Sequence, residues 1–127
     1  MKLMLIGGGE EGKGDTSYET QKIDEEIVKM SNKEHPNLLF VGLASSFADS
    51  YYDVIKKHFK ELGCTPVYLK KNNLIHNTDL VKQKFMDADI IYVGGGDTIK
   101  LLEKIEEFHL KELFQDACKR GAVLAGI

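Results

Sequence analysis

A run of three glycines, Gly94 to Gly96, lies between a short apolar stretch and an amphipathic one, and it is the segment best suited to chemistry. Because glycine has no Cβ, such a turn can adopt positive φ and bring backbone N–H groups close to a ligand. Asp97 and Thr98 follow and would begin a helix whose first N–H groups have no acceptor within the helix. The pattern predicts a site for an anion or for a developing negative charge.

Asp97 is expected to cap this helix or to meet a cationic substrate group, because a carboxylate aimed at an oxyanion would oppose its charge. The alternative is a tight strand-to-helix turn that binds no ligand.

Two further turns follow predicted strands and would open at the same edge of a sheet. Gly8 and Gly9 follow the first strand, but Glu10 comes next, where a pyrophosphate would need neutral or positive surroundings. These glycines are therefore expected in a loop at the edge of the site. Ser45 and Ser46 follow the second strand, and they either offer hydroxyls to a ligand or belong to a simple helix-entry turn.

The other reactive residue types form no recognisable site. The histidines, which lack metal-ligand spacing and are expected at the surface, are His35, His58, His76 and His109, with His58 on the polar side of its helix. The two cysteines are far apart and are expected to be reduced thiols. No Gly-x-Ser-x-Gly elbow is present. The sequence thus predicts no metal site and no cofactor.

Length and charge limit the class of protein. The 127 residues predict one domain, residues 1–127, and the net charge of −3 is too small and too evenly spread to indicate a nucleic-acid or membrane-surface partner. The apolar run near the N-terminus has only four residues before Gly7, so it is no signal peptide, and no stretch has the length of a membrane span. We expect a cytoplasmic protein.

Short apolar runs alternate with segments of 3.6-residue period. Strands are predicted at Leu3 to Ile6, Leu38 to Leu43, Pro66 to Leu69, Ile90 to Val93 and Ala122 to Ile127, each buried on both faces. Helices are predicted around Ile23–Met30, Tyr52–Leu62, Leu80–Phe85, Leu101–Ile105 and Leu110–Cys118. Asp49 and Ser50 are expected to open the second helix, and Asn77 or Thr78 to cap the third.

This order predicts an α/β fold, a doubly wound three-layer sandwich with a mostly parallel sheet. In such folds the site lies at the carboxyl ends of the strands, near a topological switch point.

The segment from Ile90 to Leu102 resembles the glycine-rich segment of the peptidase E family, the aspartyl dipeptidases related to cyanophycinases. That family has a flavodoxin-like fold similar to the class I glutamine amidotransferase domain. Its members carry a Val-Leu-Ala-Gly-like strand that leads into a Gly-x-Ser-Ala-Gly elbow with the nucleophilic serine. Ala122 to Ile127 matches the strand and the first two elbow positions. The resemblance implies an apparently truncated chain, the N-terminal portion of a larger peptidase E-like domain.

The resemblance also implies the activity, that of a serine-type peptidase, a hydrolase that acts on small peptides. The N–H groups around Gly95 and Gly96 would form part of its oxyanion hole. The family position at Asp97 is often Asn, which leaves the role of this carboxylate open. The nucleophile and the general base are expected beyond Ile127, so none of the four histidines inherits the base role. The 127-residue chain by itself is expected to be inactive.

Two other functions fit parts of the pattern. Kinases of the NAD and diacylglycerol type use a Gly-Gly-Asp-Gly-Thr turn, which Gly95 to Thr98 resembles with one glycine missing. That resemblance implies a phosphate- or nucleotide-binding domain. A non-catalytic binding protein is the third possibility, and it rests on the absent nucleophile.

The last predicted strand, Ala122 to Ile127, has no helix after it. We therefore expect an exposed apolar strand edge that pairs with another chain and gives a homo-oligomer.

Overall fold

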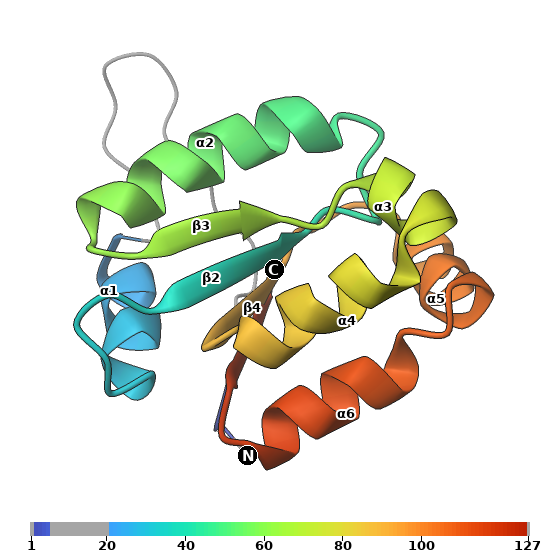
Figure 1. The fold of residues 1–127 in the computed structure, drawn as a ribbon. Coiled ribbons are helices and arrows are strands. Elements are labelled where there is room, and N and C mark those ends of the chain that lie inside the picture. The colour runs from blue at the N-terminus through green and yellow to red at the C-terminus, as the bar shows by residue number, and fades with distance from the viewer. Residues whose placement is uncertain (1, 6–20, 127) are drawn as a thin grey trace.

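The structure is a computed structural model that describes residues 2–5 and 21–126 (Figure 1). The turn with Gly8 and Gly9 lies outside the described residues. The described elements are β1 (Lys2–Leu5), α1 (Gln21–Met30), β2 (Asn37–Val41), α2 (Ala48–Glu61), β3 (Thr65–Tyr68), α3 (Lys71–His76), α4 (Thr78–Asp87), β4 (Ile90–Val93), α5 (Thr98–Glu107), α6 (Lys111–Lys119) and β5 (Val123–Gly126).

The five described strands form one sheet in the order β1-β5-β4-β2-β3, and every neighbouring pair is parallel. Helices cover both faces of this sheet, with α2 on one side and α4 and α6 on the other (Figure 1). The predicted three-layer α/β sandwich is confirmed, and the described part of the sheet is parallel throughout.

Two apolar cores lie on the two faces of the sheet, because successive side chains of a strand point to opposite faces. One core joins Leu38 and Phe40 of β2 to Ile27 of α1 and to Ile55 and Phe59 of α2. The other core joins the alternate strand residues to the remaining helices, and its members include Leu39, Val41, Ile91, Val81, Phe85, Leu110 and Ala117.

Burial on both faces is confirmed for the interior strands β2 and β4 but is wrong for the two edge strands. All four residues of β3 are partly or largely exposed, and Leu3 of β1 is 44% exposed. Pro66 lies in β3, where an edge position tolerates a residue that cannot donate to the ladder. Short apolar runs alone do not reveal which strands lie at an edge.

The predicted exposed edge at the last strand is also wrong for its described residues. β5 lies between β1 and β4, so Leu124 pairs with Leu3 on one side and with Ile91 on the other. The order of the elements along the chain does not reveal this arrangement, because the partner on that side is β1, the first strand of the chain. The homo-oligomer predicted from that edge therefore loses its physical reason.

The predicted starts of α2 and α4 have different outcomes. Asn77 caps α4 as expected, since its Oδ1 accepts a hydrogen bond from the Leu80 N–H at 3.1 Å. α2 begins at Ala48 rather than at Ser50, and no side chain caps it.

The prediction of a surface position for His58 is wrong. His58 is 1% exposed, and its Nε2 lies 2.8 Å from Oδ2 of Asp24, which is fully buried on α1. A hydrogen-bonding partner from another helix makes this burial tolerable. The other three histidines, His35, His76 and His109, are exposed as predicted.

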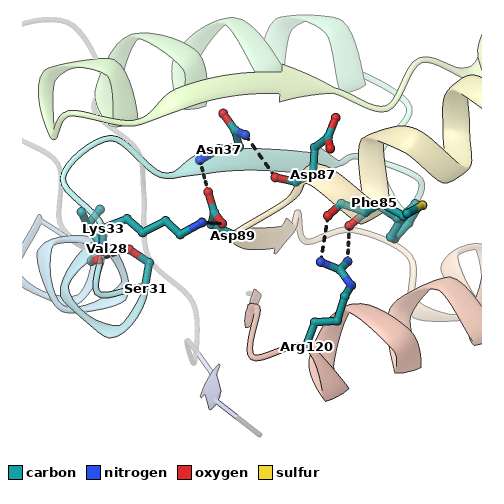
Figure 2. Close-up of polar contacts among 9 residues, drawn as sticks. Val28, Ser31, Lys33, Asn37, Phe85, Asp87, Asp89 and Arg120 are labelled. Atoms are coloured by element: carbon teal, nitrogen blue, oxygen red, sulfur yellow. Dashed lines mark hydrogen bonds and ion pairs between the residues drawn. The ribbon is translucent and has the colours of Figure 1, made fainter.

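Polar contacts lie at the amino-terminal ends of the central strands (Figure 2). Asp89 accepts hydrogen bonds from the Asn37 backbone N–H at 2.9 Å and from Lys33 Nζ at 2.6 Å. Arg120 donates to the carbonyl oxygens of Met86 at 2.7 Å and Phe85 at 2.8 Å, at the end of α4. These contacts lie at the end of the sheet opposite to the carboxyl ends of the strands, where ligands of parallel α/β folds bind.

Candidate functional site

The carboxyl ends of three adjacent strands lie level with one another. Val41 of β2 pairs with Val93 of β4, and Val93 pairs with Gly126 of β5. The loops that leave β2 and β4 and the chain that leaves β5 therefore emerge together. Two of the predicted turns, those with Ser45 and with Gly94, meet at this edge.

The loops after β2 and β4 are in direct contact. The Asp97 N–H donates to the Ala44 carbonyl at 2.8 Å, and the Gly94 N–H donates to the Val41 carbonyl at 2.9 Å. Gly96 has φ of 146°, and a Cβ added there would overlap the Ala44 carbonyl group. Only glycine fits this position, since both the backbone conformation and the close approach exclude a side chain.

The two loops diverge after this contact. β2 continues into α2 on one face of the sheet, whereas β4 continues into α5, whose Leu101 and Ile105 pack on the other face. This divergence of adjacent strands makes the gap between β2 and β4 a topological switch point, where binding sites of parallel α/β folds lie.

Asp97 is the N-cap of α5, as predicted. Its Oδ1 accepts hydrogen bonds from the N–H groups of Ile99 at 2.9 Å and Lys100 at 3.1 Å. The carboxylate satisfies two donors at the positive end of the helix. A phosphate bound at this helix start would have to approach a carboxylate that already occupies those N–H groups.

The central N–H groups of the glycine turn differ from each other. The Gly95 N–H points to the hydroxyl oxygen of Tyr51 on α2, at an N–O distance of 3.4 Å. The Gly96 N–H has no hydrogen-bond acceptor among the residues that the structure describes. A backbone donor without an acceptor beside a switch point is a feature of anion-stabilising turns.

Ser45 and Ser46 lie beside a pocket. Ser45 Oγ accepts a hydrogen bond from the Phe47 N–H at 3.0 Å, which favours its role in the helix-entry turn. Ser46 is exposed. Both serines line a pocket of about 1000 Å³ that is bounded by the loop after β2 and the start of α2, by the end of β3 and the residues after it, and by helix α5.

The pocket carries both signs of charge. Its charged lining residues are Asp49, Asp53, Lys70, Lys71, Lys100 and Lys104. Lys104 is engaged by Glu107, with an Nζ–Oε2 distance of 2.9 Å, and lies over the Phe108 ring.

Two stacked tyrosines form part of the pocket wall. The Tyr52 and Tyr68 rings lie 4.5 Å apart between centroids, and the Tyr68 hydroxyl donates to Asp49 Oδ1 at 2.8 Å. Burial raises the pKa of Tyr68 above its ordinary value, and the bond to Asp49 raises it further. Burial and the nearby Asp53 carboxylate raise the pKa of Tyr52 as well. Both phenols are therefore neutral hydrogen-bonding groups at physiological pH.

Metal and membrane chemistry find no support in the described part of the chain. No group of three His, Cys, Asp or Glu side chains within residues 2–5 and 21–126 is placed to hold a metal ion. In the same residues, no helix combines the length and the apolar character needed to cross a membrane. Cys64 and Cys118 are both free thiols.

Sequence reasoning missed Tyr51 and the pocket. A signal for Tyr51 was present, because Tyr51 lies four residues before the core residue Ile55 and so shares its helix face. The pocket had no comparable signal, since its lining comes from three separate segments.

Known proteins match this chain in sequence. The profile of peptidase family S51 matches residues 3–127. The chain is 33% identical over 127 residues to a protein named "Uncharacterized peptidase YgaJ" from Bacillus subtilis (strain 168), and the match covers 100% of this chain and 54% of that protein. It is 27% identical over 115 residues to "Peptidase E" from Shewanella denitrificans, with 89% of this chain and 46% of that protein covered. The chain thus spans about half the length of the curated relatives it matches.

Solved structures match the fold over the same share of their length. A peptidase from an acI-B1 actinobacterium superposes with a TM-score of 0.76 at 21% identity, over 98% of this chain and 52% of that one. A "Putative Peptidase E Protein" from Listeria monocytogenes EGD-e superposes with a TM-score of 0.71 at 19% identity, over 98% of this chain and 56% of that one.

Proposed function

The chain belongs to peptidase family S51, and we propose that residues 1–127 form the N-terminal portion of a serine peptidase domain that hydrolyses small peptides. The observation that carries this proposal is the register of β5 against β4. Val93 pairs with Gly126, so the chain that leaves β5 starts beside the glycine turn that leaves β4. A nucleophile placed shortly after Gly126 would therefore lie close to the N–H groups of Gly95 and Gly96.

In the proposed reaction, a serine beyond Ile127 attacks the carbonyl carbon of a small peptide, and its proton passes to a histidine that also lies outside these residues. The carbonyl oxygen becomes an oxyanion, which accepts a hydrogen bond from the glycine turn. The histidine then gives the proton to the leaving amine as the peptide bond breaks, and water releases the acyl group. One well-placed donor contributes about 3–4 kcal/mol to this step.

The Gly96 N–H is the better-supported oxyanion donor of the pair. It has no acceptor among the described residues, whereas the Gly95 N–H already points to Tyr51. Asp97 has an indirect role, because it holds the turn in place. Its side chain caps the start of α5, and its N–H donates to the Ala44 carbonyl group.

The chain by itself is proposed to be inactive. Asp24 and His58 are a histidine–carboxylate pair within the described residues, but their exposures of 0% and 1% keep any substrate away from them. A catalytic base needs hydrogen-bond access to the proton that it takes.

A phosphate-binding function receives less support. The Asp97 carboxylate occupies the Ile99 and Lys100 N–H groups, which are the donors that a phosphate would need at this helix start.

The test compares two proteins, the 127-residue chain and a longer protein that continues beyond Ile127. A fluorophosphonate probe should label a serine in the longer protein only, and hydrolysis of a small-peptide library should follow the same division. Replacement of the labelled serine by alanine is the matched control and should abolish both signals. Hydrolysis by the 127-residue chain, or a longer protein with neither labelling nor hydrolysis, would overturn the proposal. In that second case, binding of peptides without turnover would identify a non-catalytic binding protein.

A further inference from the structure

The glycine turn between β4 and α5 is held at both ends by backbone and in its middle by one side chain. Gly94 donates to the carbonyl group of Val41 at the end of β2, and Asp97 donates to that of Ala44 on the loop after β2. Between them, the Gly95 N–H donates to Tyr51 Oη at 3.4 Å. Tyr51 belongs to the first turn of α2, so this contact joins the turn to a different element from its other anchors.

The Tyr51 ring packs against the sheet and against the glycine turn. Its centroid lies 5.1 Å from that of Phe40, a fully buried residue of β2, with the planes inclined at 52°. Gly94 lies against both rings, because a Cβ added there would be 3.0 Å from Phe40 and 3.1 Å from Tyr51 ring atoms. The hydroxyl is therefore presented to the Gly95 N–H by a ring that has little freedom to move.

The direction of one peptide group constrains the next. The Gly95 N–H carries one hydrogen, which is directed toward Tyr51 on α2 rather than toward a substrate oxygen. The bond also fixes the plane of the peptide group between Gly94 and Gly95, and the next peptide group carries the Gly96 N–H. Because a misaligned donor loses most of its value to a transition state, this fixation matters for an oxyanion donor.

We propose that Tyr51 is a positioning residue of the peptidase site, whose hydroxyl holds the Gly95 peptide so that the Gly96 N–H remains directed to the reacting carbonyl. This inference deepens the proposed function and rests on it for its catalytic consequence. The structural part, the bond from Gly95 to Tyr51, stands independently.

The first experiment measures the bond without any activity. In the ¹⁵N-labelled 127-residue chain, Tyr51→Phe removes the hydroxyl and keeps the ring, so the fold should be retained. The Gly95 amide proton signal should shift upfield, and its hydrogen exchange should become roughly two- to tenfold faster, as expected for loss of one modest hydrogen bond. Tyr52→Phe is the matched control on the same turn of α2, and it should leave the Gly95 signal in place. A Gly95 signal that is the same in Tyr51→Phe and in the parent chain would overturn the proposal.

The second experiment uses the longer protein that continues beyond Ile127. Tyr51→Phe should lower kcat roughly three- to tenfold and leave KM within about twofold, because a misaligned oxyanion donor weakens only the transition state. An unchanged kcat, or a loss confined to KM, would overturn the positioning role. If the parent protein itself hydrolyses no peptide, the proposed function fails, and the Gly95 signal then decides whether Tyr51 orders the turn.

Discussion

Gly96 carries the tightest local constraint of the candidate site. Its φ of 146° disfavours any side chain, and the Ala44 carbonyl lies where a Cβ would be. The glycine run was recognisable as chemistry in the sequence, but the reason for this particular glycine is a contact with a loop about fifty positions earlier. The backbone conformation and the nearby Ala44 carbonyl group therefore both exclude a side chain at Gly96.

Replacement of Gly96 by alanine tests this constraint against Gly121→Ala as a control. Gly121 also has positive φ, 97°, but nothing lies within 4 Å of its missing Cβ. We expect Gly121→Ala to lose about 1–3 kcal/mol of unfolding free energy from backbone strain alone. Gly96→Ala should lose about 1–3 kcal/mol more, because it adds a steric overlap with backbone. Urea unfolding of both variants gives the comparison, and equal losses would contradict the overlap.

Cys64 gives a prediction about pH. The thiol is buried, and burial raises its pKa from 9.0 to about 12. Since the thiolate is the reactive form, Cys64 should resist iodoacetamide at pH 8 to 9 in the folded chain and react once urea unfolds it. Cys118 is only half-buried and should be alkylated first. Mass spectrometry of the two peptides measures the order, and early modification of Cys64 in the folded chain would contradict it.

The same shift links stability to pH. A pKa raised in the folded state means that the unfolded chain releases this proton first as pH rises. The contribution of Cys64 to stability is therefore complete below about pH 9 and falls as the pH rises toward 12.

At the scale of elements, helices α1 and α2 are joined by a polar contact that the hydrophobic pattern hid. Asp24 and His58 each lie on a helix among charged neighbours, and both were consistent with a solvent-exposed position. In the structure their side chains meet at 2.8 Å inside the core. A stripe of apolar residues indicates which face of a helix is buried, but it does not identify polar residues that are buried through a partner on another helix.

The end of α4 depends on α6 through Arg120, whose guanidinium donates to the Phe85 and Met86 carbonyl groups. Those carbonyl groups lie in the last turn of α4, where a helix lacks its own donors and carries negative partial charge. We expect Arg120→Ala to lower the free energy of unfolding by about 1–2 kcal/mol, because two hydrogen bonds from a charged donor disappear.

The control for this change is Lys119→Ala. Lys119 is also exposed and lies in the last turn of α6, but within the described part of the chain its side chain makes no hydrogen bond or ion pair to α4. Lys119→Ala should lower the free energy of unfolding by no more than about 0.5 kcal/mol. Thermal or urea unfolding distinguishes the two variants, and equal effects would show that Arg120 acts only as a surface charge.

At the scale of the whole molecule, the arrangement of strands decides which part of the sheet is weakest. β4 and β2 are paired on both sides, whereas the edge strands β1 and β3 each pair with one described strand, and β3 is in addition covered by α2. Leu3 of β1 is also 44% exposed. Regions with few buried contacts open most easily, so β1 should be the least protected strand.

Hydrogen exchange of the 127-residue chain tests this order. Amides of β4 and β2 should exchange slowest, and those of β1 should exchange fastest. The measurement should be repeated at two protein concentrations, because association through the side of β1 that pairs with no described strand would slow its exchange as the concentration rises. Protection of β1 equal to that of β4 at low concentration would contradict the described sheet order.

The sequence by itself determined the fold class, the strand–glycine turn–helix unit and the cap at Asp97, because these features depend on residues close together in the chain. Periodicity, glycine content and capping are local properties, and the resemblance to peptidase E was carried by two short motifs of the same kind. The family match confirms that resemblance.

Only the tertiary structure decided the place of β5 between β1 and β4, the burial of His58 with Asp24, and the approach of Tyr51 to Gly95. Each of these depends on partners that lie 30 or more positions away along the chain, and the packing of the whole sheet brings them together. A sequence pattern records which residues prefer burial, but pairing between distant segments is decided by the shape and polarity that the other elements leave for them.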